Sequence, residues 1–227
     1  MNPFKTLAQK PWLAQPVGAE HAGRDFSTDS HASATIALRF VLAIVSVLFF
    51  LFILTFLSRS QYPDFQSLAG QPWQPFTDPS RLWLNTGLLV FGSLAIQLGL
   101  NAARRDQLNR TIVGISAAVF FTVMFLLAQL NLWQHLHSLG FYVGNNPANS
   151  YFYMLTAVHG LHLIGGLIVL TNVVFRVWYD GSVERLISPL KLCATYWHFL
   201  LGIWLILFAL LTSQPDTINA LAAMCGF

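Results

Sequence analysis

The fold is decided by the stretch Y-F-Y-M-L-T-A-V-H-G-L-H-L-I-G-G-L-I-V-L, residues Tyr151 to Leu170. The run is apolar and long enough to cross a bilayer, which takes about 20 residues in a helix. It carries two histidines near its middle, His159 and His162. Ionisable groups at membrane depth are costly and usually mark function or a contact between helices. A spacing of three residues places both rings on one side of a helix.

Glycines in the same stretch, Gly160, Gly165 and Gly166, allow a neighbouring helix to approach closely. One face of this segment is therefore expected to contact protein. Three roles are open for the two histidines: hydrogen-bonded packing residues, haem or metal ligands, and groups that relay protons or bind a substrate. The polar residues of the other apolar segments must decide among these roles.

The composition indicates a polytopic membrane protein. Of 227 residues, 55% are hydrophobic and 9% are charged, and the mean hydropathy is +0.57. In soluble domains about a quarter of the residues are charged. The net charge is +3, but the cations stand mostly at the ends of apolar segments, which favours membrane topology over nucleic-acid binding as their explanation.

Five apolar segments predict an all-α bundle of five transmembrane helices over residues 34–213. The expected spans are 34–57, 82–101, 112–135, 151–178 and a last one that begins after Pro189, a favourable first-turn residue, and ends near Thr212. A polar N-terminal arm, residues 1–33, precedes them, and a short tail, residues 214–227, follows. No apolar segment before residue 34 suits a cleavable signal peptide, so the first span is expected to be the targeting signal.

Basic residues predict the orientation in the membrane. Of the 12 Lys and Arg, all but Arg59 and Arg81 fall on one side of the predicted bundle. The positive-inside rule then places the N-terminus in the cytoplasm and the C-terminus outside. Cys193 and Cys225 are expected on opposite sides, so no disulfide is predicted, and no Cys/His cluster indicates a zinc or iron–sulfur site.

The nine Asp and Glu all lie in the arm, the loops or the tail, so no carboxylate-based catalytic or metal site is expected in the spans. At a rise of about 1.5 Å per residue, His159 and His162 lie about 13 and 18 Å from the outer end of their span. His198, in the last span, lies at a similar depth. We expect the three histidines to share one layer, with His162 and His198 hydrogen-bonded directly or through Thr156, Thr195 or Tyr196.

The polar residues of the spans are thus predicted to form a seam between helices with a structural role, and none is assigned to catalysis or to a metal. The seam consists of Asn85, Gln129, Thr156, His159, His162, Tyr196 and His198. A competing hypothesis makes the chain a stand-alone b-type cytochrome with His162 and His198 as axial ligands, which needs a gap wide enough for a porphyrin.

These residues resemble subunit III of the haem-copper respiratory oxidases over about residues 34–213. The family pattern of an aromatic run, T-G-x-H-G-x-H-V and a glycine is similar to Tyr151 to Gly166. The final-span pattern Y-W-H-F-V-D resembles residues 196–201, L-N-T matches residues 84–86, and Q-x-x-E-Y/W aligns with residues 129–133. Where the family commonly has acids, this chain has Ser46, Leu132 and Leu201, so the proton-related roles suggested for the family are not expected.

The resemblance implies a non-catalytic accessory subunit of a haem-copper terminal oxidase, of the short five-helix bacterial type, in the inner membrane. Its partners would be subunit I, which holds the haems and copper and reduces dioxygen with electrons from cytochrome c or a quinol, and subunit II. Phospholipids are expected in a cleft between helices, and no cofactor is expected in the chain itself. An accessory subunit of a nitric oxide reductase is the alternative within the same broad family.

Overall fold

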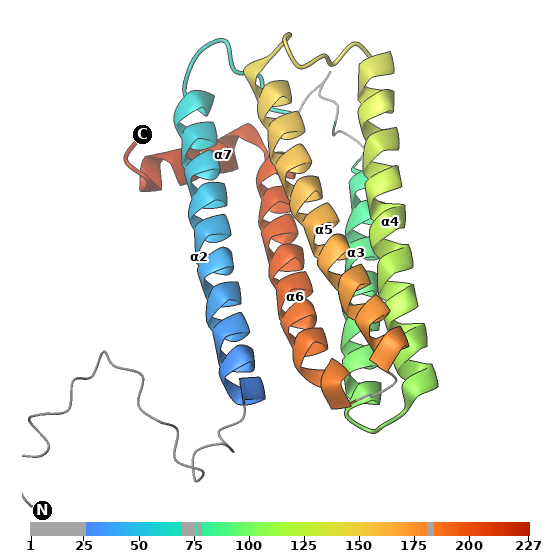
Figure 1. Ribbon diagram of the computed structural model, residues 1–227. Coiled ribbons are helices and arrows are strands. Elements are labelled where there is room, and N and C mark those ends of the chain that lie inside the picture. Colours follow the sequence, from blue (N-terminus) through green and yellow to red (C-terminus); the bar gives the residue numbers. More distant parts are fainter. Residues whose placement is uncertain (1–25, 70–75, 77–78, 181–183) are drawn as a thin grey trace, which may run out of the picture. The chain divides into compact units, whose positions relative to one another are not determined.

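The computed structural model describes residues 26–69, 76, 79–180 and 184–227, which are helical apart from short connections. Five long helices run side by side (Figure 1), and each is long and apolar enough to span a membrane. They are α2 (Phe26–Ser60), α3 (Ser80–Ala103), α4 (Leu108–Ser138), α5 (Pro147–Asp180) and α6 (Glu184–Thr212). The prediction of an all-α structure with five membrane-spanning helices is confirmed. The packing described below is that of residues 38–227, which form one compact unit.

The helices extend beyond the apolar segments that predict them. Most of the predicted arm lies outside the described residues, but α2 already begins within it, at Phe26. The prediction that Pro189 lies in the first turn of the last helix is wrong, because α6 begins at Glu184 and contains Pro189. A proline this close to a helix start removes a single backbone hydrogen bond, to the carbonyl four residues earlier, and the helix continues through it.

The predicted tail contains a further helix, α7 (Pro215–Met224), which the sequence analysis missed. Pro215 stands in its first turn, and Ile218 and Ala222, one helical turn apart, are buried in the core of the bundle. The helix lies across the end of the bundle at which α2 and α6 finish (Figure 1). A hydrogen bond of 3.4 Å from Gln61 Nε2 to Asn219 Oδ1 joins it to the residues after α2. The tail therefore closes one end of the core.

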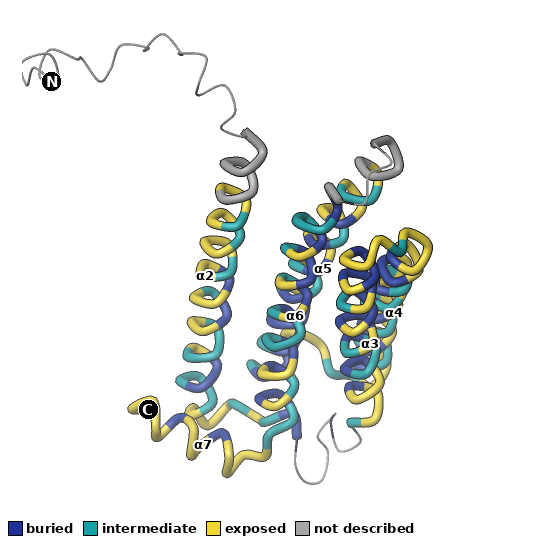
Figure 2. The backbone as a smooth tube through the Cα atoms, turned by 90° about the horizontal axis from the view of Figure 1, so that it is seen from below, coloured by how far each residue is buried: buried dark blue, intermediate teal, exposed yellow. Residues whose placement is uncertain are grey.

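The closest helix contact in the bundle joins α3 and α4. A methyl group built on Gly114 would lie 2.5 Å from Gly99 Cα and 2.7 Å from Gly99 N, so the two backbones touch at these glycines. Small residues at a helix crossing allow this approach in membranes, where van der Waals packing replaces the hydrophobic effect between helices. Figure 2 shows buried residues on the facing sides of the helices and exposed residues along the outer side of α2.

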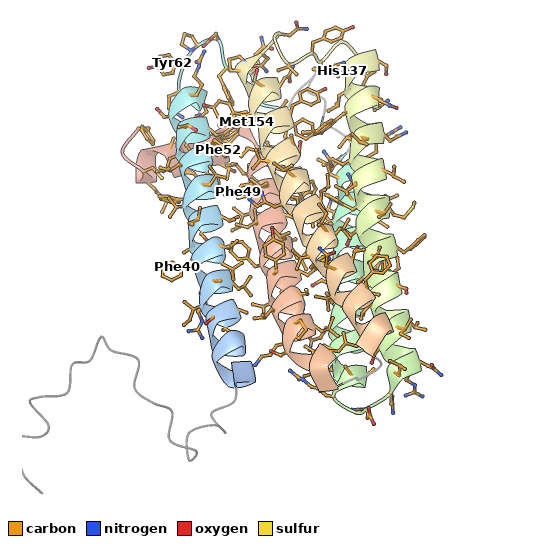
Figure 3. All side chains as sticks on the ribbon, viewed as in Figure 1. Phe40, Phe49, Phe52, Tyr62, His137 and Met154 are labelled. Carbon is orange, nitrogen blue, oxygen red and sulfur yellow. The ribbon has the colours of Figure 1, made fainter. Side chains whose placement is uncertain are left out.

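Helix α2 is separated from α6 by a groove of about 690 Å³. Side chains between Ser46 and Ile53 form one wall, side chains between Phe199 and Ile206 form the other, and the surface is almost wholly apolar. Phe49 points from α2 toward the other helices, whereas Phe40 points away from them (Figure 3). Ring packing by Phe49 and Phe56, both buried, holds α2 against the bundle.

Candidate functional site

His159, the first histidine of the predicted seam, is completely buried on α5. Three aromatic rings surround it, with centroids at 5.2 Å (Trp204), 5.9 Å (Phe125) and 6.4 Å (Phe49). Among the described residues neither ring nitrogen has a hydrogen-bond partner. Phe125 and Phe49 contact the imidazole edge to face, and Trp204 lies tilted to it by 37°. Aromatic contacts contribute about 0.5–1.5 kcal/mol beyond the burial of their surface. In this arrangement the imidazole packs as an aromatic ring.

The other two histidines bond to their own helices. Nδ1 of His162 lies 2.7 Å from the carbonyl oxygen of Val158, and Nδ1 of His198 lies 2.5 Å from that of Ala194. A carbonyl only accepts, so Nδ1 carries the proton in each ring and Nε2 of the neutral imidazole is an acceptor. The expected hydrogen bond between His162 and His198 is therefore wrong. His162 is half-buried beside Phe49, and His198 is exposed.

Helices α5 and α6 are in direct contact between these two histidines. The hydroxyl of Tyr196 donates to the backbone carbonyl of His162 over 3.1 Å. A methyl group on Gly166 would lie 2.9 Å from Tyr196 Cε1 and 3.1 Å from Trp197 Cζ3. A porphyrin between the two helices would have to force them apart, so the b-type cytochrome hypothesis does not fit this contact. The described residues also contain no group of three His, Cys, Asp or Glu that could hold a metal ion.

Asn85 and Gln129 form a buried pair that joins α3 to α4. Nδ2 of Asn85 donates to Oε1 of Gln129 over 2.8 Å, and both side chains are buried. Nε2 of Gln129 has no partner among the described residues. An amide pair of this kind fixes how two helices are rotated and aligned, since breaking it leaves polar groups in an apolar interior.

Three tryptophan–threonine hydrogen bonds connect α3, α4, α5 and α6 to one another. Of their six residues, the predicted seam contains only Thr156. The indole N–H groups donate to threonine Oγ1 in the pairs Trp204–Thr86 (α6 to α3, 3.0 Å), Trp197–Thr122 (α6 to α4, 3.1 Å) and Trp133–Thr156 (α4 to α5, 3.2 Å). Each threonine hydroxyl in turn donates to the carbonyl four residues earlier in its own helix, over 2.7 to 2.9 Å. The hydroxyl therefore both donates and accepts.

A sequence signal for two of these tryptophans exists. Tryptophan in membrane proteins gathers at the interfaces with water, yet Trp197 and Trp204 stand well inside the last span, seven residues apart on one face. A buried indole needs an acceptor for its N–H, and the spans offer threonines. Both tryptophans are buried.

The end of the bundle that carries Arg59 and Arg81 is held by local polar contacts. Both guanidinium nitrogens of Arg59 bond to the carboxylate of Asp64, one of them over 2.7 Å, and this holds the pKa of Asp64 below its ordinary value. Arg81 donates to Oδ1 of Asn131 over 3.2 Å. The side-chain amide of Asn146 forms two bonds with the backbone of Gln66, accepting from its N–H over 3.2 Å and donating to its carbonyl over 2.6 Å.

Comparison with known proteins gives a consistent result. The family model described as "Cytochrome c oxidase subunit III" matches residues 21–213. A "Probable cytochrome c oxidase subunit 3" of Nocardia farcinica is 29% identical over 168 residues, which cover 70% of this chain and 76% of the relative. A "Cytochrome bo(3) ubiquinol oxidase subunit 3" of Buchnera aphidicola is 30% identical over 127 residues, covering 56% of this chain and 65% of the relative. A probable subunit 3 of Mycobacterium tuberculosis is 28% identical over 155 residues, covering 66% and 75%.

Proposed function

This chain belongs to the cytochrome c oxidase subunit III family and is an accessory subunit of a haem-copper terminal oxidase; on that premise we propose that it binds and stabilises the catalytic subunit I. Haem and copper would belong to that partner, and subunit II would complete the assembly. The observation that carries the proposal is the family match over residues 21–213, which includes all five membrane-spanning helices.

The contacts inside the bundle support a structural role for the chain. Three Trp–Thr bonds and the Asn85–Gln129 bond each join two helices of this chain. His159 is enclosed by rings, which keeps it away from any substrate. The part that the structure describes thus gives the chain a rigid body that a partner can bind.

We further propose that the groove between α2 and α6 binds phospholipid acyl chains. Its walls are Phe, Ile and Val side chains, and its volume of about 690 Å³ suits a flexible hydrocarbon chain. Lipid there would fill space between α2 and the rest of the bundle. Extraction of the purified complex followed by lipid analysis should recover phospholipid, and filling the groove from the α2 side with Ser46→Phe should lower the amount recovered.

For the location, we propose the bacterial inner membrane with the N-terminus in the cytoplasm. The distribution of basic residues supports this orientation, since Arg59 and Arg81 share one end of the bundle and both have local partners there. The opposite end carries Arg104 and Arg105 in the connection between α3 and α4, and Arg110 in the first turn of α4.

Affinity purification of the tagged chain from its native membranes in mild detergent tests the main proposal. We expect a haem-bearing, copper-containing subunit to copurify, with a reduced-minus-oxidised difference spectrum and oxygen consumption. Purification of a haem-free chain alone would contradict it. An accompanying protein that reduces nitric oxide instead of dioxygen would also contradict it.

A further inference from the structure

His198 is exposed on α6 although it lies near the middle of a helix segment long and apolar enough to span a membrane. The span that contains it is Leu186–Thr212. At about 1.5 Å per residue, His198 is about 18 Å from one end and about 21 Å from the other. The hydrocarbon core is about 30 Å thick, so lipid head groups and bulk water do not reach this depth. An ionisable side chain here is expected to be covered by protein.

The residues around His198 form a regular seam along the exposed side of α6. Going along the helix, the seam positions follow one another at alternating steps of four and three: Lys191, Thr195, His198, Gly202, Leu205 and Ala209. Gly202 is half-buried and the others are exposed. This alternation is the heptad spacing by which one helix packs against another in a left-handed pair. Thr195, Gly202 and Ala209, which follow one another at seven-residue intervals, are small and allow another helix to approach closely. We name these six residues the α6 seam.

The chemistry of His198 selects among the possible occupants of the α6 seam. Its Nδ1–H already donates to the carbonyl of Ala194, which leaves Nε2 as an acceptor that needs a donor. A lipid chain has no donor to offer. A second copy of α6, related by twofold symmetry, would bring another acceptor to the same depth. A helix with a hydroxyl, amide or indole N–H group satisfies it.

We propose that the α6 seam is the surface by which this chain binds a transmembrane helix of its partner subunit, and that this helix donates a hydrogen bond to Nε2 of His198. The inference rests on the proposed function, since it identifies the surface used for that assembly. Thr195 and Gly202, one turn to either side of His198, admit the partner backbone. His198 is then a positioning residue that fixes the depth of the partner helix.

Thr195 provides a variant in the seam that does not line the groove between α2 and α6. Its side chain is exposed, and its hydroxyl donates to the carbonyl of Lys191 in its own helix over 3.0 Å. Thr171 is the matched control, because it is also exposed, on α5, and its hydroxyl donates to the carbonyl of Leu167 in its own helix over 2.7 Å. A phenylalanine at position 195 obstructs the seam, so we expect Thr195→Phe to lower the copurified haem subunit at least tenfold, while Thr171→Phe retains it.

Substitution of His198 tests the hydrogen bond. His198→Phe keeps a ring and removes the acceptor, and the loss of one bond between helices is expected to lower the yield of haem subunit about three- to tenfold in mild detergent. His198→Gln keeps an acceptor and should retain more of the partner. A lipid phosphorus assay on the same samples separates loss of partner from loss of groove lipid.

A photo-crosslinking residue, benzoylphenylalanine, placed at Leu205 in native membranes identifies the occupant directly. We expect a crosslink to the haem-bearing subunit. Crosslinks only to lipid or to a second copy of this chain would overturn the inference, as would equal yields from Thr195→Phe and Thr171→Phe. If the unaltered chain copurifies no haem protein at all, the proposed function fails and the inference fails with it.

Discussion

Adding one methyl group to Gly114 should force α3 and α4 apart. The new carbon in Gly114→Ala would lie 2.5 Å from Gly99 Cα, 2.7 Å from Gly99 N and 3.0 Å from the carbonyl oxygen of Ala95. Carbon atoms in ordinary contact are about 3.5–4.0 Å apart, so the helices must separate by about 1 Å. All three obstructing atoms belong to the backbone and cannot rotate away. Overpacking of this kind costs about 1–3 kcal/mol.

The matched control is Gly99→Ala, which adds the same group on the other side of the same contact. Its methyl carbon would lie 3.4 Å from the nearest atoms, Gly114 C and Cα and Ile115 N, so a shift of a few tenths of an ångström is enough. Alanine also favours the helix over glycine by up to about 1 kcal/mol. We expect Gly99→Ala to be neutral or slightly stabilising.

The free energy of unfolding is measured for both variants in mixed micelles of a mild detergent and sodium dodecyl sulfate, with circular dichroism and tryptophan fluorescence as signals. We expect Gly114→Ala to be less stable than Gly99→Ala by at least 1 kcal/mol. Two variants of equal stability would refute the reasoning, because they would mean that the backbones do not touch at Gly114.

Three further outcomes are expected. His159→Phe should keep the stability of the chain, because the new ring fills the same aromatic surroundings and the two unpartnered nitrogens are removed. His159→Ala should lower the free energy of unfolding by about 2–4 kcal/mol through the cavity it leaves. Equal losses for the two variants in unfolding experiments would contradict this. Cys225 is exposed and Cys193 is buried, so a membrane-impermeant maleimide should label Cys225 in intact spheroplasts. Cys225→Ser should abolish the labelling. Labelling only after lysis would mean that the orientation is the reverse of the one proposed. Because Arg59 lowers the pKa of Asp64, their pairing stabilises the fold above pH ~4, and this stabilisation is lost as the pH falls through the lowered pKa. Asp64→Asn should therefore lower the melting temperature slightly at pH 7, and the difference from the unaltered chain should shrink as the pH is lowered below about 4. A difference that stays constant as the pH falls would argue against the pair.

Five spans could be predicted because a transmembrane helix has a strong local signal. A run of about 20 apolar residues is long enough to cross the bilayer as a helix, and this can be read from the run itself without knowing what it packs against. α7 lacks that signal, since it is short and only partly apolar. Its pattern was nevertheless readable: Pro215 suits a first turn, and Ile218 and Ala222 follow at the spacing of one helix face. The start of the last helix was predicted too late in the sequence, because a helix tolerates proline at several positions near its start and not only in the first turn.

The polar contacts could be predicted only as a set of residues. Depth along a helix follows from residue counting, but partners depend on how each helix is rotated about its axis. Rotation turns His198 outward and encloses His159 in rings, although residue counting predicts a similar depth for both. Indole donors were overlooked because tryptophan is usually assigned to the interface. Whether the seven predicted residues act as a structural seam remains a prediction.

The Trp–Thr bonds have a mechanical consequence. They tie α3 to α6, α6 to α4 and α4 to α5, so sliding α6 along its axis would break two of them at once. Between Leu38 and Ser60, the side-chain hydrogen bonds of α2 stay within the helix or join it to Gln61 and Asp64, just beyond its end. Helices α3, α4, α5 and α6 are therefore tied to one another by hydrogen bonds, whereas residues 38–60 of α2 are held against them by side-chain packing. An outward movement of residues 38–60 of α2 would therefore widen the groove and separate the rings of Phe49 and Phe56 from those of α5, without breaking a side-chain hydrogen bond to another helix.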